Sequence, residues 1–305
     1  MYDFTFQPDD ITLPGGAFAK AHRCRLRHRG QSVLALTQGD FRPYVYPLYS
    51  PAGFAVTSEA PSDHPHHSSL WIAADHLHLL MPAAGNSVEE YTYNFYVNEA
   101  FQGRAPGRLV ETAVSGREVS PRAFEIVQKI EWRGPVEWAA RAGRLAAVER
   151  RTITVSVGEA YNRIDVTSQL TASDFAIRLG PTRHAWFNVR VADSMIVANG
   201  GVVIDDTGHS TCKALCGEGA RWVDFSGPVG GNSTAGITVI PHPLEGRTPF
   251  WFVADWGVIT VGPFRSRPLD LEPGEAFEST YSVIVHDGDG VEAQVAEIAR
   301  EILGG

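Results

Sequence analysis

Alternation of apolar and polar residues with a period of two is the feature that most limits the fold of this chain. Ile126, Ile130 and Trp132 share one parity, and so do Ile153 and Val155. Alternate side chains of a strand point to opposite faces, so such segments bury one face against a second sheet. Strands rich in β-branched and aromatic residues are expected at Ser32–Thr37, Ala123–Trp132, Arg150–Val157, Tyr161–Leu170, Val202–Asp205, Gly236–Ile240, Val258–Val261 and Tyr281–His286. The pattern predicts a mainly β protein, a large antiparallel sandwich.

The number of domains is predicted from the chain length and from the lack of internal repeats and linkers. At 305 residues the chain is long for one domain, but sandwiches and barrels reach this size as single units. There is no repeat of roughly 20 to 50 residues and no low-complexity linker. We therefore predict one domain spanning residues 1–305. The glycine-rich segment Ser226–Ser233 is expected to be a loop between strands.

One helix is expected near the end of the chain, at about residues 290–303. Apolar residues recur there at steps of three and four positions: Val291, Val295, Ile298 and Ile302. Asp289 is a suitable N-cap, and Glu292 three positions later completes a capping box. We expect this helix to pack against the sandwich.

Charge and composition exclude several classes of function. The net charge is -9, and the basic residues are scattered, which argues against a nucleic-acid partner. No apolar stretch approaches the roughly 18 to 20 residues of a membrane-spanning helix, and Met1–Asp10 does not resemble a signal peptide. Three cysteines suit a reducing compartment. We expect a soluble, cytoplasmic protein, and the sequence leaves a homo-oligomer open.

Histidines crowd into one part of the chain. Five of the eleven fall within fifteen positions: His64, His66, His67, His76 and His78. Imidazole exchanges protons near neutral pH, and the carboxylate of Asp63 can orient it. Alternatively, the rings cap turns in a loop that Pro61 and Pro65 rigidify. Crowded titratable rings shift one another's pKa, so we favour a proton-transfer site with Asp63 and the first three histidines as catalytic candidates.

A metal site is the other use of such a cluster. The spacing does not match a zinc motif, and Pro65 makes the segment extended or turned. In an extended segment His64 and His66 converge while His67 points elsewhere. If a metal binds, its ligands would be His64, His66 and His184. We expect no cofactor.

A second candidate segment is Gly180–Asn188. Here Arg183 offers a planar fork for substrate oxygens, and His184 can act as the acid or base opposite the first loop.

Four further side chains are candidates for substrate binding. Arg42 and Tyr46 lie in a proline-containing segment, and Arg42 can equally form a surface ion pair. Trp71 and Trp186 follow the two histidine segments, where an indole can stack on a sugar ring.

Read together, these segments resemble the bacterial PmoA-like family, whose members are domains of unknown function. The resemblance spans roughly residues 40 to 287. It is carried by Arg42–Leu48, Pro51–Gly53, Val56–Thr57, Pro61–His67, Trp222–Gly227, Gly236–Ile237, His242–Pro243, Pro249–Trp251 and Leu271–Glu275, with the proline-histidine segment the most specific. The name suggests a membrane enzyme that oxidises methane, which the lack of a spanning helix argues against.

The resemblance implies a β-supersandwich similar to galactose mutarotase and other aldose epimerases. In those enzymes an open concave sheet binds sugars, with His and acidic residues as acid and base. This chain departs from the family pattern at His67-Ser68-Ser69, where members commonly have His, then Arg or Lys, then Gly. The stretch Asn94–Arg108, with Phe95, Tyr96 and Phe101, is also individual and is expected to shape the pocket.

The leading hypothesis is a carbohydrate-active isomerase, lyase or hydrolase, with a sugar or sugar-like small molecule as substrate. His66 and His184 would be acid and base, Asp63 and His64 would orient them, and Arg42 and Arg183 would hold substrate oxygens. Two alternatives are a non-catalytic carbohydrate-binding protein and a metal-dependent hydrolase or oxygenase that uses the same histidines.

Overall fold

The computed structural model describes residues 3–8 and 22–304. The N-terminal segment in which no signal peptide is expected, Met1–Asp10, lies partly outside these ranges. No helix within them is long and apolar enough to cross a membrane.

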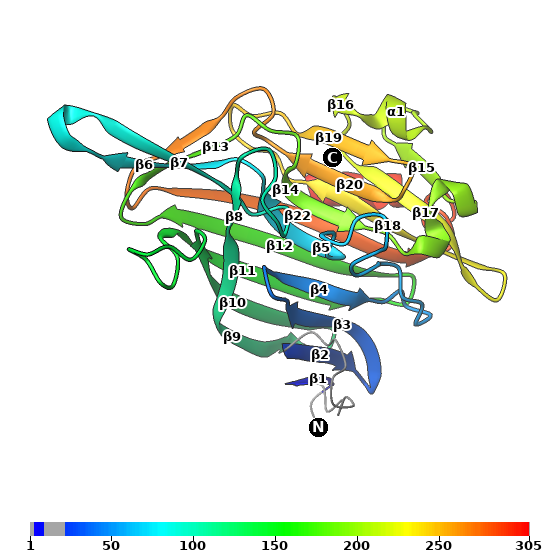
Figure 1. Cartoon of the computed structure of the whole chain (residues 1–305). Helices are drawn as coiled ribbons and strands as arrows, with labels where there is room; N and C mark the ends of the chain where they lie inside the picture. Colours follow the sequence, from blue (N-terminus) through cyan, green and yellow to red (C-terminus); the bar gives the residue numbers. More distant parts are fainter. Residues whose placement is uncertain (1–2, 9–21, 305) are drawn as a thin grey trace.

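The first sheet has nine strands in the order β1-β2-β3-β4-β5-β14-β20-β19-β16 (Figure 1). Its strands are β1 (Phe4–Pro8), β2 (His22–His28), β3 (Gln31–Gln38), β4 (Pro43–Leu48), β5 (Leu70–Ala74), β14 (Ala185–Arg190), β20 (Val258–Gly262), β19 (Phe250–Ala254) and β16 (Gly217–Glu218).

The second sheet has eight strands in the order β15-β17-β18-β22-β12-β11-β10-β9. They are β15 (Val202–Asp205), β17 (Val223–Gly230), β18 (Ser233–Pro241), β22 (Ala276–Asp287), β12 (Tyr161–Ala172), β11 (Leu145–Val157), β10 (Ala123–Arg133) and β9 (Arg108–Ser120).

A smaller, five-stranded sheet adjoins them in the order β21-β13-β6-β7-β8. Its strands are β21 (Leu269–Leu271), β13 (Ala176–Leu179), β6 (Leu77–Pro82), β7 (Val88–Asn94) and β8 (Ala105–Pro106). The β7–β8 pair is parallel, and the other strand pairs of the three sheets are antiparallel. Figure 1 shows the β6–β7 hairpin projecting away from the two large sheets.

The main core lies between the two large sheets. Leu34 and Ile72 from the first sheet and Ile126, Ile130 and Trp132 from the second are fully buried in one apolar cluster. The alternation that predicts a two-sheet sandwich is therefore confirmed, and all eight predicted strands form strands of the structure. Burial of one face per strand stabilises this packing because apolar surface leaves water.

The prediction of a loop at Ser226–Ser233 is wrong. The segment continues β17 as far as Gly230 and pairs with β18 across a two-residue turn at Gly231-Asn232. Both turn residues have positive φ, 58° and 63°. This is the conformation that a tight hairpin requires and that Gly and Asn adopt most readily. The glycine-rich segment therefore forms part of the β17–β18 hairpin.

The expected C-terminal helix is present but shorter than predicted. Asp289 accepts hydrogen bonds from the backbone N–H groups of Val291 and Glu292, both at 2.9 Å, so the predicted capping interaction forms. Residues 290–294 nevertheless form turns, and α2 (Val295–Leu303) begins after Gln294, whose φ is 56°. Val291 is consequently exposed.

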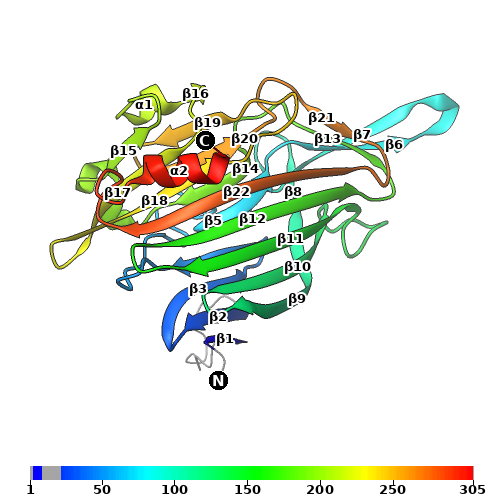
Figure 2. The same ribbon diagram turned by 180° about the vertical axis from the view of Figure 1, so that it is seen from behind.

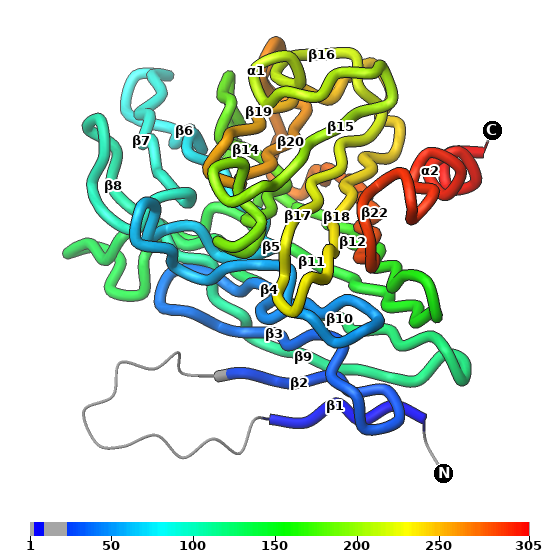
Figure 3. The backbone as a smooth tube through the Cα atoms, turned by 90° about the vertical axis from the view of Figure 1, so that its right-hand side faces the viewer, coloured from blue at the N-terminus to red at the C-terminus, as the bar shows by residue number. Residues whose placement is uncertain are grey.

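Helix α2 covers the outer face of the second sheet, where Val295 and Ile298 pack on Ile240, Ile284 and Trp222. Figures 2 and 3 show it lying along β22 and β18. The remaining helices are short: α1 (Cys212–Leu215) and the 3-10 turns η1 (Ala84–Asn86), η2 (Asp193–Met195) and η3 (Val197–Asn199).

Candidate active site

Two chain segments cross from the first sheet to the five-stranded sheet at the same place. Strands β5 and β14 pair in the first sheet, with Ala74 opposite Ala185. Strands β6 and β13 pair in the smaller sheet, with Leu77 opposite Leu179. The short connection of β5 to β6 must therefore lie beside the connection of β13 to β14. This register brings residues 75–76 against residues 180–184.

Gly180 joins the two connections directly. Its N–H donates to the carbonyl of His76 at 3.0 Å, and its φ is 78°. A Cβ at this position would lie 2.8 Å from the carbonyl oxygen of Phe264. Glycine is required here because the backbones approach closely and φ is positive.

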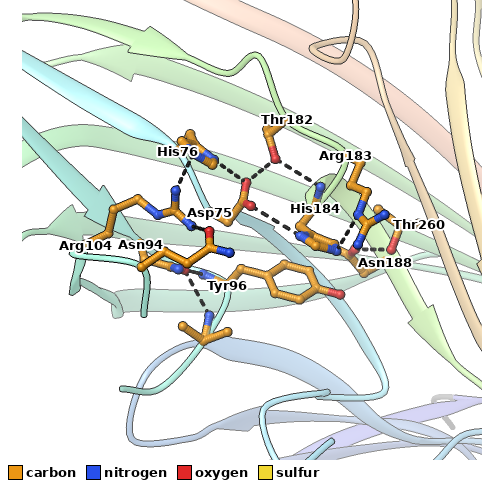
Figure 4. A network of polar contacts seen from close by, with 12 residues as sticks. Asp75, His76, Asn94, Tyr96, Arg104, Thr182, Arg183, His184, Asn188 and Thr260 are labelled. Carbon is orange, nitrogen blue, oxygen red and sulfur yellow. Dashed lines mark hydrogen bonds and ion pairs between the residues drawn. The ribbon is translucent and has the colours of Figure 1, made fainter. Parts of the chain in front are cut away.

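Asp75 and His184 are the centre of the polar network at this junction (Figure 4). Nδ1 of His184 lies 3.3 Å from Oδ2 of Asp75, and the hydroxyl of Thr182 donates to Oδ1. The Thr182 oxygen also accepts a hydrogen bond from the N–H of His184 at 3.0 Å. An acceptor at Nδ1 places the ring proton there, so Nε2 of His184 carries the lone pair.

The Asp75 carboxylate is held in its charged form. Burial opposes ionisation, but contacts from His184, His76 and Thr182 outweigh it and hold the pKa of Asp75 well below its usual range. The Nδ1 atom of His76 is 3.1 Å from Oδ1, outside hydrogen-bond geometry. On the far side of this ring, Arg104 contacts Nε2 of His76. A carboxylate and an imidazole in this arrangement form a dyad that can transfer protons.

The histidine loop, residues 61–68, consists of two successive turns. The N–H of His64 donates to Pro61 O at 3.1 Å, and that of His67 donates to His64 O at 2.9 Å. All three rings therefore meet: the His64 and His66 ring centroids are 5.8 Å apart, and each lies 4.7 Å from that of His67. The expectation that His67 points elsewhere is wrong, because the segment is turned and alternation does not apply.

The loop and the dyad belong to one closed series of ring contacts, which we call the aromatic circuit. Its six members, each touching the next, are His64, His66, Tyr96, His184, Phe252 and Trp256. Successive centroids are 5.8, 5.6, 5.3, 5.8, 6.3 and, back to His64, 5.2 Å apart. Tyr96 is buried, Trp256 is 38% exposed and the other four are partly exposed. The imidazoles of His66 and His184, 118 residues apart in the chain, thus flank the ring of Tyr96.

Two buried rings pack against this circuit. His67 lies 5.9 Å from Tyr96 and 5.3 Å from Trp71, and both His67 and Trp71 are less than 4% exposed. Burial, together with the charges of neighbouring rings, lowers the pKa of His67 to about 2. Burial and the charge of Arg42 lower that of His66 to about 4. Both imidazoles are therefore neutral at pH 7.

Asp63 is committed to a structural ion pair. Arg190, which is 2% exposed, donates to both of its oxygens at 3.0 and 3.1 Å. Nδ1 of His64 lies 3.0 Å from the same carboxylate. Burial opposes ionisation, but these partners lower the pKa of Asp63 to about 2. Asp63 therefore positions His64 on the circuit, and its oxygens already have partners.

Arg42 supports the loop from within the protein. The side chain is 2% exposed, and its guanidinium donates to the carbonyls of His66, Phe95 and Tyr96 at 2.8 to 3.3 Å. It also donates to Ser68 and to Asn98. These bonds place Arg42 in the support of the loop, so the alternative of a surface ion pair is wrong. Its role in substrate binding stays a prediction, and Arg42 also lines the hollow beside the loop.

A hollow of about 260 Å³ borders the histidine loop, away from the dyad. Its lining includes Pro65, His67, Tyr44 and Glu59, but neither Asp75 nor His184. His184 of the dyad and His66 lie on the circuit instead. Tyr46 is outside the circuit, and its ring centroid lies 5.3 Å from the guanidinium carbon of Arg23.

A metal fits this arrangement poorly. Across residues 3–8 and 22–304, no group of three or more His, Cys, Asp or Glu side chains is arranged to hold a metal ion. The ring of His184 is engaged at both nitrogens, with Asp75 at Nδ1 and with Arg183 at Nε2.

The sequence as a whole matches one family model, described as a family of unknown function (DUF6807), over residues 23–300. The chain belongs to this family. The predicted membership in a family of unknown function is thereby confirmed, while the PmoA-like name stays a prediction. No curated protein matches the DUF6807 chain in sequence.

The solved structures similar to the DUF6807 chain include two of low identity. A galactose mutarotase-like protein from Lactobacillus casei is 8% identical, with a TM-score of 0.42, over 93% of this chain and 100% of that one. A galactose mutarotase related enzyme from Lactobacillus acidophilus is 8% identical, with a TM-score of 0.34, over 83% and 95% of the two chains.

The two tryptophans expected to stack on a sugar are buried. Trp71 packs beneath the circuit with 0% exposure. Trp186 lies in the core between the sheets, stacked on Trp132 at 5.3 Å, and donates to Ser279. Trp256, which sequence reasoning left unassigned, is the exposed indole of the site.

Sequence reasoning also missed Asp75, Thr182 and Phe252. Asp75 had a local signal, because it is a carboxylate directly after a buried strand and directly before His76. Thr182 had one as well, because it lies two residues before His184 in the second candidate segment, Gly180–Asn188. Phe252 had none, since only the pairing of distant strands brings it to His184.

Proposed function

We propose that this DUF6807 protein is an enzyme that transfers protons on a sugar or sugar-like polyol at the aromatic circuit. The observation that carries the proposal is the Asp75–His184 dyad on the same circuit as His66, with Nε2 of His184 on the side away from the carboxylate. The half-exposed rings of Phe252 and Trp256 suit the apolar face of a sugar.

Each imidazole has a defined part in this chemistry. His184 acts as the base: Nε2 takes a proton from a substrate hydroxyl, or from a carbon next to a carbonyl, and returns it in the reverse step. Asp75 stabilises the imidazolium that forms. His66 is neutral at pH 7, so it donates an N–H hydrogen bond to the oxygen on which negative charge develops.

The test is a panel of aldoses, ketoses and sugar acids incubated with the protein in D2O and followed by proton NMR. Deuterium incorporation, accelerated anomer exchange or new products report turnover. We expect His184→Asn to lower kcat by about 100-fold or more, which is typical of a lost general base, with no change in the urea midpoint.

The matched control is His209→Gln. His209 also pairs with a carboxylate, Asp205, at 2.9 Å, but it lies outside the circuit. We expect it to leave turnover unchanged. Full activity in His184→Asn, or activity retained while stability collapses, would contradict the assignment.

The half-exposed aromatic rings also favour a second candidate, a carbohydrate-binding protein without catalysis. Calorimetry on the same panel distinguishes the two functions. Saturable binding of a sugar whose spectrum never changes, with equal affinity in wild type and His184→Asn, would favour binding alone.

A further inference from the structure

Arg183 stands at the exposed edge of the circuit, between His184 and Phe252. Its Nε donates to Nε2 of His184 at 3.2 Å, and its guanidinium carbon lies 5.0 Å from the Phe252 ring centroid. The side chain thus covers the lone pair on which the proposed reaction depends.

The remaining donors of Arg183 are uncommitted. Three neighbouring arginines are engaged: Arg190 binds Asp63, Arg42 binds backbone carbonyls, and Arg104 contacts His76 and Gln102. For Arg183, no carboxylate of the described chain lies within ion-pair distance, and no hydrogen bond is formed by Nη1 or Nη2 within that part. A guanidinium presents these donors as a planar fork that matches the two oxygens of an oxyanion.

We propose that Arg183 binds an oxyanion of the substrate and, in moving toward it, uncovers Nε2 of His184. The substrate is then an anionic sugar derivative, a sugar carboxylate or a sugar phosphate. This inference rests on the proposed function, and it adds substrate class and a reason for the contact with the base. A neutral sugar leaves Arg183 on His184, so it binds without freeing the base.

The experiment measures dissociation constants by calorimetry for sugars that differ at one position. D-Galactose is compared with D-galacturonate, and D-glucose with D-glucuronate and D-glucose 6-phosphate. The proteins are wild type, Arg183→Gln and Arg265→Gln. Arg265 is a matched control because it is also exposed and lies 5.6 Å from an aromatic ring, that of Phe250.

We expect the wild type to bind at least one anionic sugar tenfold or more tightly than its neutral counterpart. Arg183→Gln should lose this preference while its affinity for the neutral sugar changes less than twofold, and Arg265→Gln should keep it. The uronate and phosphate arms decide which oxyanion is recognised. The Nε2 resonance of His184 in ¹⁵N NMR should shift on addition of the preferred anion in wild type and in Arg265→Gln, but not in Arg183→Gln.

The failures are distinguishable. Equal affinity for neutral and anionic sugars in wild type, with turnover of the neutral ones, would overturn the inference and leave the proposed function intact. A preference for anions that persists in Arg183→Gln would do the same. If no sugar of either kind binds or reacts, the proposed function is contradicted and the inference falls with it.

Discussion

The buried guanidinium of Arg42 offers a direct test of how the histidine loop is held. We consider Arg42→Met, which keeps most of the side-chain length and removes every donor. The backbone carbonyls of His66, Phe95 and Tyr96 would lose a charged partner. A buried acceptor left unpaired costs about 1 to 3 kcal/mol, so three of them cost about 3 to 9 kcal/mol.

Part of this loss is offset because the substitution also removes a buried charge. Burial lowers the pKa of Arg42 from 12.5 to about 10. A tenfold change in proton affinity is about 1.4 kcal/mol, so the burial cost is about 3 kcal/mol. With about 6 kcal/mol as the middle of the first range, we expect Arg42→Met to lower the free energy of unfolding by about 3 kcal/mol.

Urea unfolding followed by tryptophan fluorescence measures this loss, with Arg265→Met as a surface control expected to change stability by less than about 0.5 kcal/mol. Hydrogen exchange should accelerate at the amides of Ala60 and His67, which bond within the loop. Arg42→Lys should be no better than Met, because a point charge keeps the burial cost and reaches fewer carbonyls. A loss below about 1 kcal/mol for Met, or full rescue by Lys, would refute this reasoning.

Three other substitutions give contrasting outcomes. The first is His67→Gln. Because the pKa of His67 is depressed, below about pH 6.5 the unfolded chain binds a proton that the folded protein does not. The free energy of unfolding of wild type should therefore fall by about 2 kcal/mol more than that of His67→Gln between pH 7.5 and pH 5, measured by urea unfolding at both pH values. Asp224→Asn should lower the free energy of unfolding by about 3 to 5 kcal/mol, measured by thermal unfolding, because it removes the charged partner of the fully buried His286, 2.9 Å away. A loss under about 1 kcal/mol would mean that the pair is not charged. Ser69→Gly should raise the free energy of unfolding by about 1 kcal/mol, measured by calorimetry. Ser69 has a φ of 62° and a buried hydroxyl without a hydrogen-bond partner. Destabilisation by this substitution would contradict that reasoning.

Most strands of the second sheet were predictable because alternation is a local property, whereas only β3 and β20 of the first sheet were predicted. Ile126, Ile130 and Trp132 show their buried face in the sequence itself, and tertiary structure only adds the partner sheet. Helix α2 was predictable in existence but not in length. The capping residues Asp289 and Glu292 form their local bonds, yet residues 290–294 form turns and the helix begins at Val295, which packs on the second sheet.

The site was predictable only where its residues are local. The histidine loop and His184 were identified from composition, and the structure brings His66 and His184 to the same tyrosine. Asp75 and Phe252 reach His184 through strand pairing, which no local pattern encodes. The burial of Arg42 was not predictable, because burial of a charged side chain depends on the fold around it, here on three carbonyls from two distant loops.

The histidine loop breaks the local rules that the rest of the chain obeys, and it does so at both ends. Ala60 and Ser69 have φ values of 49° and 62°, a region that costs residues other than glycine about 1 kcal/mol or more. Between them, three imidazoles are crowded together over an arginine that has burial costs of its own. Such departures persist where the surrounding structure enforces them, and they concentrate at functional sites. A loop that served only to connect Thr57 to β5 would gain stability by relaxing each of these features, so their combination argues that the position of the rings is what the loop maintains.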